Sequence, residues 1–438
     1  MSSLLYVYYG DDFTGSTDVL ESLALAGIES VLFLGLPSQK HLETFPSCQT
    51  IGIAGDSRSQ TPDWMSANLP EIFERLKAFE APVTHYKTCS TFDSSPTQGN
   101  IGRAMEIGHE IFTPEFIPIV VGAPHLGRYV VFGNLFATAN GQVYRIDEHP
   151  TMRCHPVTPM TEADLRKHLA KQTAMPVGLI DVRALNVDAA TALATEKSAG
   201  TQAVLFDGID DTSLATTGKL LWHEATHRPL FAVGSSGLTE ALITQWQSTG
   251  ITAPSPKHQS KPVDQILVLS GSCSPVTEGQ IRWARVNGFT AISIDPSKLT
   301  NPATTVATAQ AAEQECIEEL AKGRSVILYT ALGPLTTGAA PHGEQLGTRL
   351  GKLLKSLLSN NPVRRIIICG GDTASHALQQ LGLYALTWSA SVEPGAPLCH
   401  AHSDDQIFRN LELVLKGGQI GGQDFFELVC NGGRTLRR

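Results

Sequence analysis

The sequence lacks the features that would mark a membrane, secreted or cysteine-rich protein. No apolar stretch of its 438 residues approaches the roughly 20 residues that a membrane-spanning helix needs. The eight cysteines are scattered without any C-x-x-C pair, which disfavours a disulfide framework and a cysteine-based zinc site. The first residues carry no basic segment followed by a small-residue cleavage site. We therefore expect reduced thiols, a cytoplasmic location and no membrane partner.

An excess of basic residues is also missing. The chain has 33 lysines and arginines against 42 aspartates and glutamates, a formal net charge of −9. Nucleic-acid binding normally needs a basic face, so we expect no nucleic-acid partner. The motifs GxxxxGK[ST], GxGxxG after a strand and GxSxG are absent as well. P-loop kinases, Rossmann dehydrogenases and α/β-hydrolases thereby lose their usual signatures.

What the chain does contain is a regular alternation of strand-like and helix-like stretches. With 42% hydrophobic and 17% charged residues it has the composition of a well-packed α/β protein. Its length exceeds one ordinary core, so two domains are expected, each with a largely parallel sheet flanked by helices. The proline-rich stretch 252–262 has no periodicity and is the best linker. It separates predicted domains at 1–251 and 263–438.

Three apolar runs break into a short loop of small polar residues and then open an amphipathic segment. They cover residues 4–16, 266–274 and 366–373. Each pattern predicts a strand, a tight turn and a helix N-terminus, where unpaired N–H groups and the helix dipole favour an anion. Simple capping of the helix is the alternative. One such place early and two late suggest an acidic small molecule in the first half and phosphate in the second.

Adjacent acids and strand-end cations mark the first half. Asp11 and Asp12 lie on a loop that needs only one cap, so a metal, a sugar hydroxyl or a proton is a candidate ligand. Arg58, Lys87 and Arg128 each follow an apolar run. Each alone is usually a solvated surface residue, but three at equivalent strand ends indicate a partner for a carboxylate.

The late loops favour phosphate. Ser270, Ser272 and Ser274 offer hydroxyls without nearby acids, although capping explains them equally well. Gly370 and Gly371 let backbone amides face a phosphate, and Asp372 and Thr373 follow directly. Asp372 is a candidate for magnesium or a ribose, but the residues do not assign a metal site. The stretch 393–397 is a rigid turn that can border a nucleotide.

The segment 223–227 reads His-Glu-Ala-Thr-His and matches the HExxH pattern of zinc proteases. Pro229 follows almost at once, so His227 is expected in the last turn of a helix. The helix dipole explains a histidine there, and the surrounding pattern is α/β. A metalloprotease therefore remains only a minor alternative.

The blocks at 10–15, 270–274, 370–374 and 393–397 together resemble the four-carbon acid sugar kinase family, in order and spacing, over nearly the whole chain. The resemblance implies an N-terminal domain that binds a sugar acid such as threonate, erythronate or 3-oxo-tetronate, and a C-terminal domain that binds ATP with Mg²⁺. It implies an active site in the interdomain cleft and a phosphorylated sugar acid as product.

Carried over by the same resemblance, the substrate site holds Asp12, Arg58 and Lys87, to which we add Asp11, Ser90 and Arg128. The nucleotide site holds Ser272, Gly370, Gly371, Asp372, Thr373 and Gly395, to which we add Ser270 and Ser274. Asp12 is the candidate to accept the hydroxyl proton, although the sequence alone does not separate it from Asp11.

Two departures from the family pattern lie in the sugar-binding half. Where many relatives show Asp-Ser-Thr-Leu-Arg-Gly after the lysine, residues 89–94 read Cys-Ser-Thr-Phe-Asp-Ser. An Asp and an Arg are thus replaced by Cys89 and Asp93. Residues 122–125 differ as well. The exact acid stays open, with a branched 3-oxo acid such as 3-oxo-isoapionate included. The alternative function is a non-catalytic two-lobed binding protein for acidic metabolites, and a homodimer is allowed.

Overall fold

The computed structural model describes residues 4–139, 141–155, 157–252, 260–333, 343–361 and 363–433, without the side chain of Asp372. Most of the predicted linker, residues 253–259, lies outside this description. The chain divides into two compact units. One holds Met1–Ser30 and Ser38–Pro256, and the other holds Val31–Pro37 and Lys257–Arg438.

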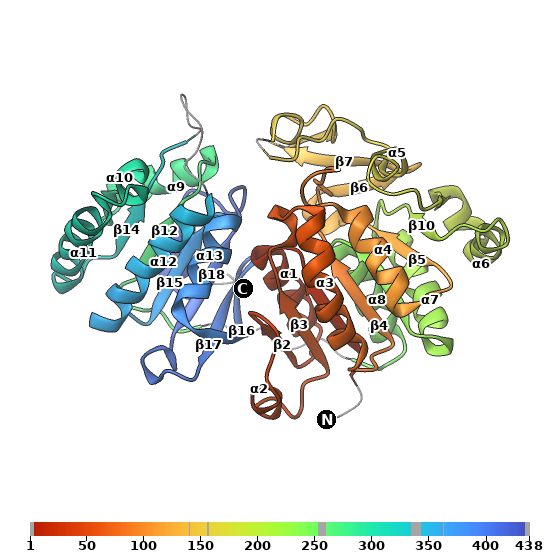
Figure 1. Cartoon of the computed structure of the whole chain (residues 1–438), viewed down its shortest axis with the longest axis horizontal. Helices are drawn as coiled ribbons and strands as arrows, with labels where there is room; N and C mark the ends of the chain where they lie inside the picture. The colour runs from red at the N-terminus through yellow and green to blue at the C-terminus, as the bar shows by residue number, and fades with distance from the viewer. Residues whose placement is uncertain are drawn as a thin grey trace, which may run out of the picture. The chain divides into compact units, whose positions relative to one another are not determined.

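The first unit is built on a parallel sheet with the strand order β3-β1-β4-β11-β5-β10-β9. These strands are β1 (Tyr6–Gly10), β3 (Thr50–Ala54), β4 (Val83–Lys87), β5 (Ile117–Val120), β9 (Val177–Ile180), β10 (Ala203–Phe206) and β11 (Leu230–Gly234). The central strands are buried along their whole length. Helices flank the sheet (Figure 1), which is why these strands read as continuous apolar runs.

Helices and 3₁₀ turns connect the strands of this unit. They are α1 (Phe13–Leu25), η1 (Ser57–Ser59), α3 (Pro62–Lys77), α4 (Ile101–Phe112), η2 (Pro124–Leu126), η3 (Met152–Cys154), α5 (Leu165–Leu169), α6 (Val182–Ser198), α7 (Asp211–His227) and α8 (Ser236–Ser248), with α2 at Gln39–Glu43. Helix α8 packs against α1 and α7, and α3 packs against α4.

A small antiparallel sheet of β6 (Arg128–Val131), β7 (Asn134–Ala139) and β8 (Gln142–Arg145) is added to the first unit. The buried carboxylate of Asp207 anchors it. Asp207 Oδ2 accepts hydrogen bonds from the amides of Phe132 (2.6 Å) and Val182 (2.9 Å), and Oδ1 accepts one from Gly133 (2.9 Å). One side chain thus ties the turn of the small sheet to the end of β10. Nothing in the chain's alternating pattern predicts this addition.

The second unit has the strand order β13-β14-β12-β15-β18-β17-β16-β2. The first five strands are parallel and the last three antiparallel. The strands are β12 (Leu267–Ser270), β13 (Thr290–Ser293), β14 (Val326–Tyr329), β15 (Arg365–Cys369), β16 (Leu383–Glu393), β17 (Ala396–Ser403) and β18 (Glu412–Lys416). Strand β2 (Ser30–Phe33) comes from the beginning of the chain and pairs with β16.

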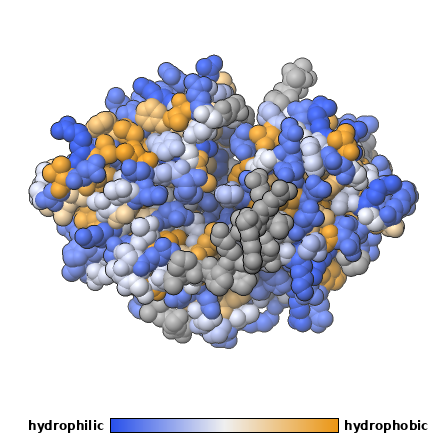
Figure 2. Space-filling view, turned by 180° about the vertical axis from the view of Figure 1, so that it is seen from behind, coloured by the Kyte–Doolittle hydropathy of each residue, from blue (hydrophilic) through white to orange (hydrophobic). Residues whose placement is uncertain are grey.

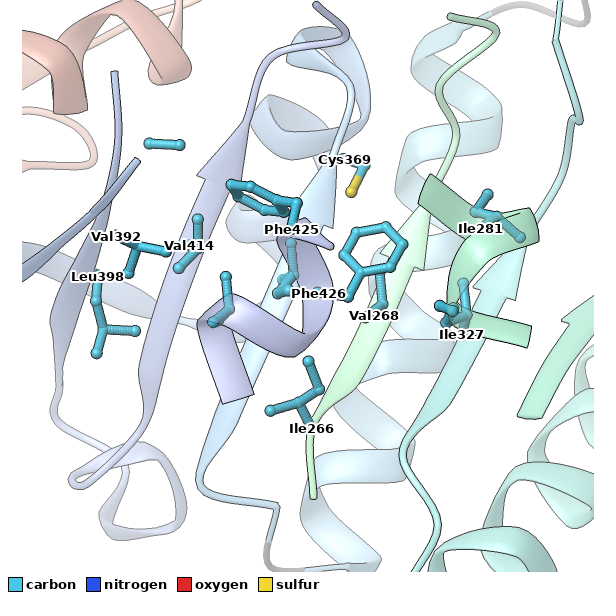
Figure 3. Packing of buried hydrophobic residues seen from close by; sticks show 14 of the residues in the cluster. Ile266, Val268, Ile281, Ile327, Cys369, Val392, Leu398, Val414, Phe425 and Phe426 are labelled. Carbon is cyan, nitrogen blue, oxygen red and sulfur yellow. The ribbon is translucent and has the colours of Figure 1, made fainter. Parts of the chain in front are cut away.

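The helices of the second unit are α9 (Pro275–Val286), α10 (Pro296–Thr300), α11 (Thr305–Ala321), α12 (Gly343–Asn360), α13 (Gly371–Leu381) and α14 (Phe425–Cys430), with η4 at Gln406–Phe408. On one side of the sheet, Phe425 and Phe426 of α14 lie over the strands that carry Val268 and Val414 (Figure 3). Burial of two phenylalanines contributes several kcal/mol by the usual ~2 kcal/mol for each aromatic side chain.

The predicted fold class is confirmed, because the sheets are largely parallel and helices flank them. The three runs at 4–16, 266–274 and 366–373 correspond to β1, β12 and β15, which are followed by α1, α9 and α13 as the pattern predicts. No helix in the described ranges is long and apolar enough to cross a membrane. The face drawn in Figure 2 is mostly hydrophilic, with hydrophobic residues in separate small areas.

A buried arginine connects β15, which precedes the Gly370 loop, with its neighbour β18. Arg365 at the start of β15 is fully buried and donates from Nε (3.0 Å) and Nη2 (2.7 Å) to Glu412 Oε2 on β18. Its other hydrogen bonds go to backbone oxygens of Val429, Cys430 and Lys261 and to the Ser260 hydroxyl. A planar guanidinium with this many acceptors fixes residues 260–261, α14 and two central strands together.

Replacing Arg365 by Met should lower the free energy of unfolding by about 3 kcal/mol or more, because Glu412 would lose its buried partner. The neighbouring Arg364, which also reaches Glu412 but has a 62% exposed side chain, is the matched control. Arg364→Met should cost less than about 1 kcal/mol. Urea unfolding followed by circular dichroism measures both, and equal losses would contradict this account.

Candidate functional site

Three strand ends bring the predicted acidic and basic residues of the first unit together. The register pairs Gly10 of β1 with Ala54 of β3 and with Lys87 of β4, so the loops after these strands leave the sheet side by side. The Asp11 amide donates to Lys87 O (2.9 Å), and the Arg58 amide donates to Asp11 O (3.1 Å). Carboxyl ends of parallel strands are where open α/β sheets bind ligands.

Asp12 caps helix α1 and uses both carboxylate oxygens. Its Oδ1 accepts from the Gly15 amide (2.8 Å), and its Oδ2 accepts from the Thr14 hydroxyl (2.6 Å) and from Arg58 Nη1 (3.3 Å). One acid of the adjacent pair, Asp12, therefore caps the helix. Its carboxylate has three donors within the protein before any ligand arrives.

Asp11 has the opposite environment. It is 3% exposed, and its Oδ1 is buried without a hydrogen-bond partner among the described residues. Burial raises the pKa of Asp11 to about 8, with the charge of Asp12 adding to the increase, while Arg58 and Lys87 act against it. The two adjacent aspartates therefore differ sharply, one fully hydrogen-bonded and the other a buried acid that is easily protonated.

Arg58 lies between two carboxylates, and the second one was not among the predicted site residues. Its Nη2 (2.7 Å) and Nε (3.2 Å) donate to Asp93 Oδ2 in the loop after β4. Asp93 also accepts hydrogen bonds from the hydroxyls of Thr91 and Thr158, the latter at 3.2 Å. Burial would raise the pKa of Asp93, but Arg58 and the Thr91 hydroxyl outweigh it and lower the pKa to about 2.

The backbone of this loop is strained next to Asp93. Phe92, which is fully buried, has φ = +54°, in the left-handed region that non-glycine residues rarely adopt. Strain of this kind collects where a side chain has to be held in a set position. The only sequence signal for Asp93 was its departure from the family pattern, and its partner could not be read from the sequence.

Lys87 is a buried cation that lacks an anionic partner. It ends β4, is 2% exposed, and makes no ion pair or hydrogen bond through Nζ with any described residue. A β-carbon placed on Gly15 would come within 2.4 Å of Asp12 Oδ1 and 2.9 Å of Lys87 Nζ. Gly15 is therefore the close neighbour of both groups, and only a residue without a side chain fits there.

Ser90 and Arg128 are placed differently from these residues. Ser90 is half-buried in the loop that follows Lys87. Arg128 begins β6 of the small sheet, and its Nη1 donates to the carbonyls of Leu126 (2.9 Å) and Gly127 (3.2 Å). No described hydrogen bond or ion pair joins Arg128 to the acids of the cluster. Its role as a substrate ligand stays a prediction.

The second unit repeats the arrangement of strand ends. Ser270 of β12 pairs with Cys369 of β15, which pairs with Lys416 of β18. The loops 270–274, 370–373 and 416–418 therefore start next to one another. Contact distances agree, because a β-carbon on Gly418 would lie 3.1 Å from Ser274 Cβ and 3.4 Å from Ser272 Oγ. Sequence reasoning named the first two loops and missed the third.

Gly370 opens helix α13 with a backbone that favours glycine. Its φ is +105°, and no side chain caps the helix at this position. The first amides of α13 therefore lack a helical partner. A β-carbon on Gly271 would lie 2.1 Å from Thr373 Oγ1, and one on Gly370 would lie 3.4 Å from Thr373 Oγ1 and 3.5 Å from Ser272 Cα, so the two loops are in close contact. Such amides at a helix N-terminus suit phosphate.

Lys416 is the main group in this half that sequence reasoning missed. It is fully buried, donates to the Thr277 hydroxyl (3.1 Å) and Gly417 O (3.0 Å), and lies over the ring of Phe425. Burial lowers the pKa of Lys416. Among the described residues it has no carboxylate partner. The Ser270 hydroxyl is also buried and has no hydrogen-bond partner in the part of the chain that the structure describes.

Gly395 lies in the two-residue turn between β16 and β17 and has φ = +77°. Leu398 of β17 pairs with Val414 of β18, so this turn is at the edge of the sheet where β18 ends at Lys416. The Pro394–Gly395 turn thus belongs to the same edge as the predicted nucleotide loops. The side chain of Asp372 lies outside the described residues.

No group of three or more metal-binding side chains is found in the ranges that the structure describes. The HExxH segment ends α7, as expected, and its Glu224 forms an ion pair with Lys197 (2.6 Å). His227 Nδ1 lies 2.8 Å from the carbonyl of His223, four residues earlier. These contacts are those of a helix end, and they give the metalloprotease alternative no support.

Comparison with known proteins assigns both halves. Residues 6–242 match the family described as "Sugar-binding N-terminal domain", and residues 267–426 match the "Nucleotide-binding C-terminal domain". A 3-oxo-isoapionate kinase from Paraburkholderia graminis is 41% identical over 98% of this chain and 95% of its own length. A 3-oxo-tetronate kinase from Methylobacterium radiotolerans is 31% identical over 95% and 96%.

A crystal structure from Salmonella typhimurium, described as a putative tRNA synthase, has the same fold with a TM-score of 0.76. It is 24% identical and covers 99% of this chain and 100% of its own. A Haemophilus influenzae structure gives a TM-score of 0.70 at 24% identity, with 96% and 98% covered. These two likenesses concern the fold alone. With its paired sugar-binding and nucleotide-binding domains, the chain belongs to the four-carbon acid sugar kinase family.

Proposed function

We propose that this sugar acid kinase transfers the γ-phosphoryl group of ATP to a terminal hydroxyl of a short 3-oxo sugar acid. In this proposal residues 1–251 bind the sugar acid and residues 263–438 bind ATP. The branched 3-oxo-isoapionate is our first choice of substrate, because the relative with that name is 41% identical, against 31% for a 3-oxo-tetronate kinase. The departures at Cys89 and Asp93 lie in the half that would hold the acid.

The unpartnered Lys87 is the observation that carries the proposal. A buried ammonium group without a counter-charge is unfavourable, so its persistence indicates an anion that arrives with the substrate. Arg58 is already shared by Asp12 and Asp93, and it orients the acids around Lys87 rather than leaving a second free cation. A sugar carboxylate would supply one negative charge at this position and pair with Lys87.

The second unit supports the nucleotide half of the proposal. The first amides of α13, beginning at Gly371, the unpartnered Ser270 hydroxyl and the buried Lys416 suit a polyphosphate. Magnesium usually takes one or two carboxylates and completes its shell with phosphates and water, so a dedicated cage is not needed. Asp372, at the start of α13, would supply such a carboxylate, and the bound ion would neutralise charge on the phosphates.

Phosphoryl transfer requires little covalent chemistry from the protein. In-line placement of the hydroxyl and neutralisation of charge supply most of the acceleration. Lys87 would hold the carboxylate, the Asp11–Asp12 pair would face the hydroxyl, and the loops at 270–274 and 370–373 would hold the phosphates. The interdomain location of the active site, the homodimer and the cytoplasmic location stay predictions.

The reaction itself is tested by coupled ADP release with threonate, erythronate, 3-oxo-tetronate and 3-oxo-isoapionate. We expect ADP release that depends on the acid, with the highest kcat/KM for a 3-oxo acid. A sugar acid that binds in calorimetry without any ADP release would instead favour the non-catalytic binding protein. ATP alone is the blank for background hydrolysis.

Replacing Gly370 by Ala should raise KM for ATP at least about tenfold, which corresponds to about 1.4 kcal/mol. Alanine at φ = +105° would strain the turn and place a methyl group in front of the phosphate amides. Gly382, at the other end of α13 with φ = +70° and open space around it, is the matched control. Gly382→Ala should cost similar stability and leave KM for ATP unchanged.

Replacing Gly15 by Ala should raise KM for the sugar acid more than about tenfold, about 1.4 kcal/mol, and change KM for ATP little. The added methyl group would displace Asp12 Oδ1 and Lys87 Nζ, the two atoms it would approach most closely. Gly35→Ala, where a β-carbon meets nothing within 4 Å, serves as the control. A Gly15→Ala enzyme with normal KM values would remove Lys87 from the substrate site.

A further inference from the structure

We propose that Asp11, and not its neighbour Asp12, accepts the proton from the substrate hydroxyl during phosphoryl transfer. This inference rests on the proposed function and assigns a role that the sequence could not separate between the two residues. It is carried by the hydrogen bonds of the two carboxylates, which differ completely although the residues are adjacent in the chain.

Both carboxylate oxygens of Asp12 are already used in hydrogen bonds that hold the protein structure. Three donors, the Gly15 amide, the Thr14 hydroxyl and Arg58 Nη1, occupy its two oxygens. A proton placed on Asp12 would break the cap of α1 and leave Arg58 with only Asp93. A proton acceptor that also caps α1 and binds Arg58 would disturb the substrate site each time it was protonated.

The side chain of Asp11 makes no such structural hydrogen bonds with the described residues. Its backbone is fixed on both sides, by the bond from its amide to Lys87 O and by the bond from the Arg58 amide to its carbonyl. Its carboxylate Oδ1 is buried and unpartnered within the described part of the chain. An unsatisfied buried oxygen is unfavourable for folding, so a partner brought by the substrate, here a hydroxyl hydrogen, explains why it is kept.

The surroundings of Asp11 place its proton exchange near neutral pH. The charged and titratable groups around it come from each element packed against it: Tyr9 of β1, Asp12 before α1, Arg58 of η1, Lys87 and Tyr86 of β4, and Asp93 after β4. Burial and Asp12 disfavour the ionised form, and Arg58 and Lys87 favour it. The resulting pKa of about 8 suits a group that must both take up and release a proton.

In the proposed step the hydroxyl oxygen of the sugar acid attacks the γ-phosphorus of ATP. The new oxygen–phosphorus bond forms while the bond from the γ-phosphorus to the bridging oxygen breaks, and ADP leaves with that electron pair. The hydroxyl proton passes to Asp11 Oδ1. Asp11 then releases the proton to water, so that one proton is produced for each acid phosphorylated.

The kinetic test compares pH profiles of the wild-type enzyme with those of Asp11→Asn and Asp12→Asn. In the wild type, kcat/KM for the sugar acid should rise about tenfold for each pH unit below about 8 and then level off. Asp11→Asn should lower kcat about 10²–10⁴-fold and remove this ascending limb. Asp12→Asn should keep the limb, whatever its rate. The reverse pattern would overturn the assignment.

Thermal unfolding at different pH values reports the protonation of Asp11 without any turnover. Because its folded pKa lies above its ordinary value of 3.8, the folded protein keeps this proton between pH 3.8 and about 8 and the unfolded chain does not. The contribution of Asp11 to the free energy of unfolding must therefore fall as the pH rises through that window. Asp11→Asn cannot ionise, so its unfolding temperature should exceed that of the wild type by an amount that grows from pH 5 to pH 9.

Asp188→Asn, on an exposed part of α6, is the matched control and should show a pH-independent difference from the wild type. A constant difference for Asp11→Asn as well would overturn the proposal, because Asp11 would not be holding the proton. Wild-type protein that releases no ADP with any of the four acids defeats the proposed function instead. The unfolding experiment would still report in that case whether Asp11 titrates, so the two failures are distinguishable.

Discussion

Register between neighbouring parallel strands is the constraint on which both halves of the molecule depend. In the first unit, Gly10, Ala54 and Lys87 end their strands at one level, and in the second Ser270, Cys369 and Lys416 do the same. A shift of one residue in any of these strands would turn its last side chain to the other face of the sheet. The positions of these side chains therefore depend on pairing deep in two buried sheets.

The buried positive charges at these strand ends lack carboxylate partners within the described part of the chain. Each unit buries a lysine at the end of a central strand, and neither Lys87 nor Lys416 has a carboxylate partner among the described residues. By contrast, the structural Arg365 has Glu412 and four further acceptors. Full compensation thus marks a group that holds the fold, and the missing compensation at Lys87 and Lys416 supports our proposal of anionic ligands there.

Much of this could be predicted from the sequence because it depends on local pattern. Apolar runs gave the strands, and small polar residues after them gave the turns at Asp11 and Gly370. Asp93, Thr158 and Lys416 were missed, since their importance depends on contacts between distant segments that only the sheet register creates. The difference between Asp11 and Asp12 was also beyond the sequence, because two identical side chains differ only in their hydrogen bonds.

The position of β2 has a consequence for how this protein is made. Val31–Pro37 belongs to the second unit, and Leu32 and Phe33 pair with Leu386 and Ala385. During synthesis this strand leaves the ribosome long before β16 exists, and long-range pairing of this kind is slow to form. A cut at the linker would not yield two complete halves, because the later fragment would lose a strand and expose the edge of β16. The two units therefore have to fold as parts of one chain. Any exchange of a unit between relatives would have to move residues 31–37 together with the second unit.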